Sequence, residues 1–147
     1  MAEAFPEDSE PDIYVYQYCN ASVEQLIEAA KCGDLQKVKY QLRKNVDPNG
    51  RDNDSNQAIH YAARIDNVEI IDVLLEANNG LINSHGNSGY TPLHYAVQYT
   101  AVKTIEYLIN KGANCNELND ENETPLHTVF NQFNECCFDK PGVNCKD

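Results

Sequence analysis

The stretch GYTPLHYAVQYTAVKTIEYLINKGANCN, residues 89–116, decides the fold, because its opening motif returns at a fixed spacing. Its Thr-Pro-Leu-His, residues 91–94, returns 33 residues later as residues 124–127. A weaker version, Gln-Ala-Ile-His, lies at residues 57–60, which is 34 residues before the first. A period of this length is typical of proteins that repeat one short structural unit along the chain.

Each unit is expected to hold two helices. In the second unit the apolar residues follow a helical period over about residues 57–65 and again over 68–77, with a polar break at Asp66-Asn67. In the first unit, Ser22 and Gln25 form a capping-box pattern, which predicts a helix that begins at residue 23.

The boundary residues of the third unit have a mechanical explanation. The hydroxyl of Thr91 can accept a hydrogen bond from a free N–H group of the first helical turn. Pro92 at the first helical position loses no hydrogen bond, because an N–H group there would have no partner inside the helix. Gly112 can take the positive φ that ends the second helix. A helix pair this short cannot bury its apolar side alone, so it must stack on its neighbours.

These residues resemble the ankyrin-repeat family, whose pattern contains Thr-Pro-Leu-His, then paired alanines, and ends on Gly-Ala-Asp-x-Asn. The third unit matches this pattern at residues 91–94, 112–113 and 116, and the second unit matches it at Ala62-Ala63. The resemblance implies an all-α, ankyrin-repeat solenoid of stacked helix-turn-helix units with projecting β-hairpin-like loops.

The chain is expected to divide into an arm and four units. Residues 1–21 form an acidic N-terminal arm that we expect to be partly disordered, and residues 22–50 resemble an N-terminal capping repeat. Ankyrin repeats are expected over residues 51–83 and 84–116. Residues 117–147 begin like the others but lack a second helix of normal length, so we expect a degenerate or truncated repeat from a longer array.

The composition is acidic, and this bounds the class of partner. Lys and Arg total 11 against 23 Asp and Glu, which gives a net charge of −12. Such a charge disfavours nucleic acid and anionic lipid, and it predicts a protein partner with a basic surface patch. No apolar run is long enough to cross a membrane and no secretory pattern opens the chain, so we expect no membrane insertion by this chain and a cytoplasmic or nuclear location.

The chain shows no pattern of an enzyme. A phosphate-binding loop, a zinc-protease motif and a serine-hydrolase motif are all missing, so we assign no catalytic residue, cofactor or metal. One histidine recurs in each unit, at positions 60, 94 and 127, and stacked units would hold these too far apart for one ion. We therefore expect each histidine to bridge its helix start to the next loop.

The six cysteines are expected to be thiols, because the chain is predicted to lie in a reducing compartment. Cys136, Cys137 and Cys145 lack the regular paired spacing of a zinc site. Cys32 and Cys115 occupy positions where a small residue fits the repeat, so we expect them to be buried or half-buried.

The resemblance implies a binding surface on the concave face, made by loop tips and the inner face of each first helix. Aromatic and apolar side chains there are the expected anchors, and the acidic loop of the fourth unit would steer a basic partner. Transferred unit by unit, the surface comprises Asn53, Asp54, Asn56, Arg64 and Ile65, then Asn87, Ser88, Tyr90, Gln98 and Tyr99, then Asp120, Glu121, Glu123, Asn131 and Gln132.

The function expected from these patterns is that of a non-catalytic protein-interaction module acting as scaffold, inhibitor or adaptor. A second hypothesis is the cytoplasmic N-terminal ankyrin array of a cation channel, serving in gating or assembly. The sequence beyond residue 147 would separate the two, since apolar spans of about 20 residues there would indicate a channel.

Overall fold

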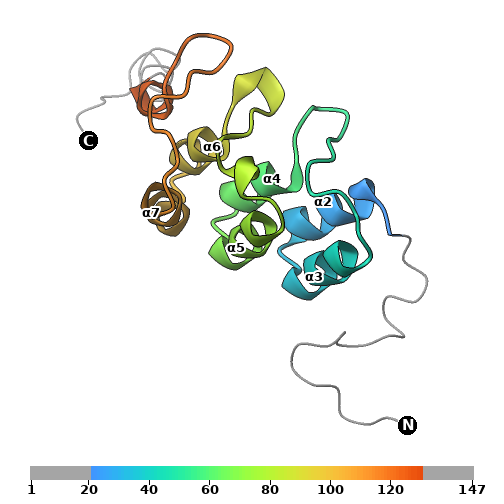
Figure 1. Cartoon of the computed structure of the whole chain (residues 1–147). Coiled ribbons are helices and arrows are strands. Elements are labelled where there is room, and N and C mark those ends of the chain that lie inside the picture. Colours follow the sequence, from blue (N-terminus) through green and yellow to red (C-terminus); the bar gives the residue numbers. More distant parts are fainter. Residues whose placement is uncertain (1–20, 131–147) are drawn as a thin grey trace, which may run out of the picture.

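The computed structural model describes residues 21–130, which form a row of helix pairs stacked side by side (Figure 1). The first helix of each pair lies in one layer and the second helix lies in the other. The pairs are α2 (Val23–Cys32) with α3 (Leu35–Arg43), α4 (Ala58–Arg64) with α5 (Val68–Ala77), and α6 (Pro92–Gln98) with α7 (Val102–Asn110). Residues 125–130 begin a further helix. The expected stack of helix-turn-helix units is therefore confirmed.

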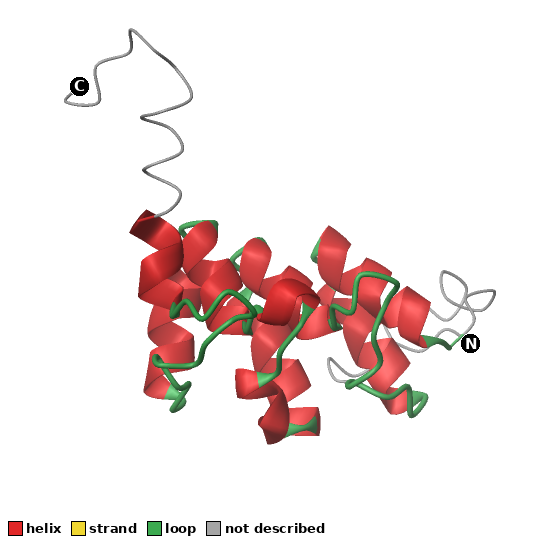
Figure 2. Cartoon of the chain, turned by 90° about the horizontal axis from the view of Figure 1, so that it is seen from above, coloured by secondary structure: helices red, strands yellow, loops and turns green. Residues whose placement is uncertain are grey.

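The loops between pairs project from the first-helix layer (Figure 1). No strand is formed in the part of the chain that the structure describes (Figure 2). Each loop is closed like a hairpin tip by a backbone hydrogen bond between residues four apart, with a second bond inside the turn. The donors and acceptors are Asp52 N–H to Asn56 O (2.9 Å), Gly86 N–H to Tyr90 O (2.7 Å) and Asn119 N–H to Glu123 O (2.9 Å). The predicted β-hairpin-like loops thus have the tight turn of a hairpin, but no paired strands lead into it in the described residues. Short 3₁₀ turns, η1 (Asn79–Asn83) and η2 (Asn87–Gly89), lie between α5 and α6.

The helix starts follow the predicted capping chemistry. The Ser22 hydroxyl accepts from the Gln25 N–H at 3.2 Å, and the Thr91 hydroxyl accepts from the His94 N–H at 3.3 Å, directly before Pro92. Both bonds satisfy N–H groups that have no partner inside their helix.

One cap is supplied from the neighbouring unit. The residue before α7 is Ala101, which has no side-chain acceptor. The Asp66 carboxylate, from the break between α4 and α5, accepts instead from both the N–H and the hydroxyl of Thr104 at 2.8 Å. A single side chain therefore caps a helix and holds two units together.

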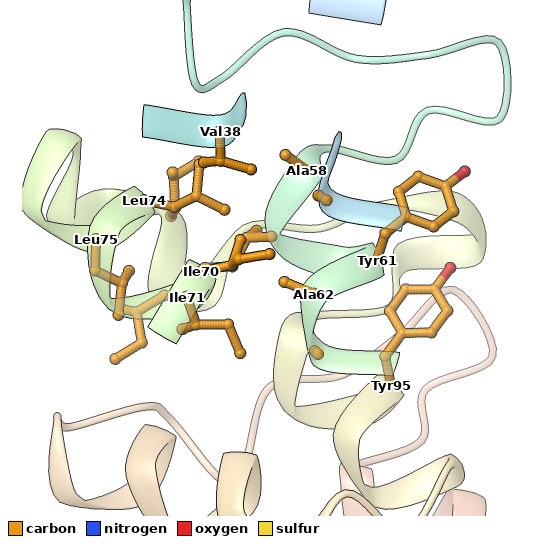
Figure 3. Close-up of a cluster of buried hydrophobic side chains, with 14 of the residues drawn as sticks. Val38, Ala58, Tyr61, Ala62, Ile70, Ile71, Leu74, Leu75 and Tyr95 are labelled. Atoms are coloured by element: carbon orange, nitrogen blue, oxygen red, sulfur yellow. The ribbon is translucent and has the colours of Figure 1, made fainter. Parts of the chain in front are cut away.

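The core is apolar and continuous across the units. Figure 3 shows Ile70, Ile71 and Leu74 of α5 packed between α4 and Val38 of α3, all fully buried. Leu93 is 3% exposed, as its place in the repeated motif predicts. The first helices carry small, fully buried residues such as Ala62 and Ala96, and short side chains let the backbones of successive units approach closely.

Two of the three recurring histidines, His60 and His94, have the structural role expected of them, and His127 accepts from the N–H of Thr124 at the start of its own helix. Nδ1 of His60 accepts from the Gln57 N–H at 2.9 Å, so the ring proton lies on Nε2, which donates to the Ser84 carbonyl at 2.8 Å. His94 repeats this arrangement one unit later, from Thr91 to the carbonyl of Glu123. Each of these two imidazoles thereby ties the start of one first helix to the loop that leads to the next.

Replacing Leu93 with Ala should lower the free energy of unfolding by about 2–5 kcal/mol, because the change leaves a cavity in the buried stack. Urea unfolding followed by circular dichroism measures the loss. The matched control is Val102→Ala, since Val102 is 60% exposed and its truncation should cost no more than about 0.5 kcal/mol. Equal effects of the two changes would contradict the core position of Leu93.

The stability should also fall in mild acid. Burial lowers the pKa of His60 from 6.5 to about 4. The contribution of the neutral imidazole to the free energy of unfolding is therefore fully present above pH 6.5 and is lost as the pH falls towards 4. His60 alone should contribute a loss of about 2 kcal/mol between pH 7 and pH 5, because its imidazole takes up a proton in the unfolded chain and resists it in the folded chain. Urea unfolding at both pH values measures it. The His60→Gln variant should show a smaller pH dependence by roughly the same amount, and an unchanged dependence would refute the assignment.

Candidate functional site

The layer of first helices and the projecting loops form what we call the inner face. An open hollow of about 550 Å³ lies on it, which we call the first hollow. It brings together side chains from three successive units, namely Lys31 of α2, Asp54 of the next loop, Tyr61, Arg64 and Ile65 at α4, and Tyr99 at the end of α6.

Two cations of the first hollow lie against tyrosine rings. The guanidinium of Arg64 lies 4.8 Å from the ring centroid of Tyr99 and 5.6 Å from that of Tyr61. The ammonium of Lys31 lies 4.6 Å from the Tyr61 centroid. Such contacts are attractive because the faces of aromatic rings are electron-rich, and they restrict the positions of otherwise flexible side chains.

Tyr61 is itself fixed from behind. Its hydroxyl donates to the Asp52 carboxylate at 2.5 Å, and the side-chain amide of Asn56 donates to that hydroxyl at 3.4 Å. Burial raises the pKa of Asp52, but hydrogen bonds from Tyr61 and from the backbone outweigh it, so the pKa lies below its usual value. Burial and the bond to Asp52 raise the pKa of Tyr61. The ring on which the two cations lie is thus held in place by an ionised carboxylate.

Asn56 is not a surface residue, although the resemblance implied that it would contact a partner. It is 4% exposed, and its side chain connects the second unit to the third. Its Oδ1 accepts from the Asn87 N–H at 2.8 Å and from the Tyr95 hydroxyl at 3.0 Å. An amide that already uses both of its ends inside the stack is a structural residue, so we leave it out of the candidate surface.

A second, smaller hollow of about 190 Å³ adjoins α6, and we call it the second hollow. Tyr90 stands half-buried at its base, with its ring 5.3 Å from those of His94 and Tyr95. The remaining lining is polar or acidic, and comprises Asn87, Ser88, Gln98 and Glu121. Tyr90 therefore packs against the core and also lines the surface, whereas Tyr99 is 46% exposed.

The acidic loop of the fourth unit lies beside the loop of the third. The Asp120 N–H donates to the Ser88 carbonyl at 2.9 Å. Gly89 has a φ of 75°, and a Cβ there would come within 2.7 Å of the Asp120 backbone nitrogen, so glycine is required for this approach. Asp120 and Glu121 are exposed, while Glu123 is half-buried and its carbonyl accepts from His94. The contact brings the Glu121 carboxylate into the lining of the second hollow, with exposed Asp120 next to it in the chain.

The structure thus gathers most of the predicted residues on one face. Asp54, Arg64, Ile65 and Tyr99 line the first hollow, while Asn53 is an exposed neighbour at the loop tip. Asn131 and Gln132 lie outside the described residues.

Sequence reasoning missed Lys31 and Tyr61, although the first could have been found by counting 33 residues back from Arg64. Tyr61 could not have been found in that way, because none of the predicted surface residues shares its register position, which Glu28 occupies in the first unit.

The expectation for Cys32 and Cys115 is wrong, because both thiols are exposed. Cys32 shares its register position with Ile65 and Tyr99, which lie at the open edge of the inner face, and Cys115 lies in a loop. Cys136, Cys137 and Cys145 lie outside the described residues. Within residues 21–130 no cluster of three or more His, Cys, Asp or Glu side chains could hold a metal ion, and no helix there is long and apolar enough to cross a membrane.

Three relatives show how far the similarity extends. A probable serine/threonine-protein kinase of Dictyostelium discoideum is 34% identical over 106 residues, which is 69% of this chain and 11% of the kinase. A putative ankyrin repeat protein of Acanthamoeba polyphaga mimivirus is 33% identical over 95 residues, covering 61% of this chain and 12% of the viral protein. Human ankyrin repeat domain-containing protein 53 is 28% identical over 130 residues, covering 86% of this chain and 24% of the human protein.

The chain spans about a tenth to a quarter of the length of these relatives, and the kinase shares with it only the repeat part. Residues 26–119 match the family model described as "Ankyrin repeats (3 copies)", which is more than half of the chain. The match runs over the three helix pairs whose capped starts, bridging histidines and projecting loops are described above, and the chain belongs to the ankyrin-repeat family.

Proposed function

We propose that this chain is a non-catalytic protein-interaction module, a scaffold, inhibitor or adaptor, that binds its partner through the inner face. The observation that carries the proposal is the first hollow, where exposed Ile65 and Tyr99 flank a guanidinium lying against tyrosine. Tyrosine and arginine are the residue types that dominate the energy of protein interfaces. Three successive units contribute to the hollow, so a partner lying there would contact the stack as a whole.

The histidine and cysteine side chains of the described residues give little support to an enzyme. Each ring nitrogen of His60 and of His94 is already engaged in the hydrogen bonds that bridge the units. Burial lowers the pKa of both imidazoles, which makes them poor proton acceptors near neutral pH. The exposed thiol of Cys32 lies 3.8 Å from the Glu28 carboxylate. A thiol beside an anion is not activated as a nucleophile.

The proposed partner is a protein with a basic patch, and a nucleic acid or a membrane is disfavoured by the net charge of −12. Asp120 and Glu121, exposed beside the second hollow, would attract such a patch. Members of a cytoplasmic or nuclear assembly are the class of partner we propose. No feature of residues 21–130 favours the channel-array hypothesis over this one, so we propose the interaction module alone.

Affinity purification from the source cells with the full chain tests the proposal, when wild type is compared with Tyr99→Ala by quantitative mass spectrometry. Because Tyr99 is exposed, we expect its truncation to leave the melting temperature nearly unchanged and to weaken partner binding at least about tenfold. Glu106→Ala is the matched control, since Glu106 is exposed on α7 in the other helix layer.

Proteins retained by wild type and by Glu106→Ala, but lost with Tyr99→Ala, would identify the partners of the inner face. Retention of the same proteins by all three chains would show that the inner face is not the binding surface.

A further inference from the structure

Building on the proposed function, we infer that the partner segment carries a carboxylate, which Arg64 and Lys31 bind in the first hollow. This requirement adds to the basic group expected at the acidic loop. The proposed partner segment therefore has mixed charge: an acidic side chain towards the second unit and a basic side chain towards the fourth. A purely basic segment, which the net charge alone would favour, does not satisfy the first hollow.

Two cations line the first hollow of a chain that carries −12. Lys31 and Arg64 share this lining with one anion, Asp54, and the Asp52 carboxylate lies behind Tyr61, where it attracts Lys31. No carboxylate of residues 21–130 lies within 4.0 Å of either cation. Both cations thus lie beside aromatic rings with no carboxylate of the described residues in direct contact.

The geometry of Arg64 suits a carboxylate. A guanidinium is planar and presents its N–H donors as a fork that fits the two oxygens of a carboxylate. The rings of Tyr99 and Tyr61 lie 4.8 and 5.6 Å from it, and the latter ring is fixed by Asp52. Less side-chain entropy is lost on binding when a donor is already restricted in this way. Exposed Ile65 offers apolar contact to the rest of the bound side chain.

Two features favour a protein segment over a polyanion such as nucleic acid. Asp54 at the rim of the first hollow repels any second phosphate or carboxylate that follows closely. Beyond it, the second hollow and its neighbouring loop present Glu121 and Asp120. The inner face therefore changes sign along the stack, and a ligand must change sign with it.

The spacing of the two charges follows from the stack. Arg64 lies in the second unit, and Glu121 lies in the loop of the fourth beside that of the third. Neighbouring helices pack about 8–10 Å apart, so one to two units separate the charges. An extended chain advances about 3.3 Å per residue, which places the acidic and the basic side chain about three to six residues apart.

A selection of random displayed peptides on the immobilised full chain tests this inference. We expect the selected peptides to be enriched over the starting library in Asp or Glu, with Lys or Arg about three to six residues away. A synthetic peptide from the selection, labelled for fluorescence anisotropy, should bind Arg64→Gln about ten- to a hundredfold more weakly than wild type, the effect of removing a charged hydrogen bond.

The matched control is Lys103→Gln, which removes one positive charge from an exposed position on α7 outside both hollows. It should leave binding of the peptide unchanged. Circular dichroism melting of both variants confirms that they are folded. Equal weakening by the two changes would show that net charge matters and the first hollow does not.

Three other outcomes would overturn the inference. One is enrichment of basic residues alone, and another is no enrichment at all. The third is enrichment only after Glu3, Glu7, Asp8, Glu10 and Asp12 are changed to their amides, since the acidic arm of the chain would then be the occupant. If cellular partners are lost with Tyr99→Ala but retained by Arg64→Gln, the proposed function stands and the carboxylate requirement fails.

Discussion

The structure depends on one constraint, which is that a pair of helices of about two or three turns has too little apolar surface to fold alone. Leu26, Ile59 and Leu93 recur at the same place in successive first helices, and each is buried against a neighbouring unit. The alanines beside them keep the helices close. Stability in such a stack is a sum over units and over the contacts between them, so the interfaces between units decide whether the chain folds.

Polar contacts give these interfaces a fixed register. His60 and His94 each join a helix start to the next loop, Asp66 caps a helix of the following unit, and Asn56 connects the second unit to the third. A buried polar group that loses its partner costs about 1–3 kcal/mol. Sliding one unit against the next would break several such bonds together, whereas apolar contacts alone would tolerate a small shift.

The inner face follows from the same arrangement. The register positions that the stack does not use, those of Arg64 and Tyr99 among them, lie at the open edge of the first helices. Their side chains are free to differ from unit to unit. In this chain they place Arg64, beside Lys31, in a hollow next to an acidic loop. The polar bonds beneath, such as that from Tyr61 to Asp52, fix the aromatic ring on which the two cations lie.

The sequence by itself determined the period, the helix starts and the buried face, because these depend on local chemistry repeated in phase. Thr91 before Pro92 predicts a capped helix wherever it occurs, and Leu93 follows as a core residue. The sequence also singled out Asp54, Arg64, Ile65 and Tyr99, which line the first hollow, because each repeat places its loop tip and the end of its first helix at the same positions. Only the tertiary structure decided that Asn56 is buried and that Cys32 is exposed. It also decided that Lys31 and Tyr61 join Arg64, because contacts across units depend on which side chains the stacking brings together, and nothing local to either residue specifies them.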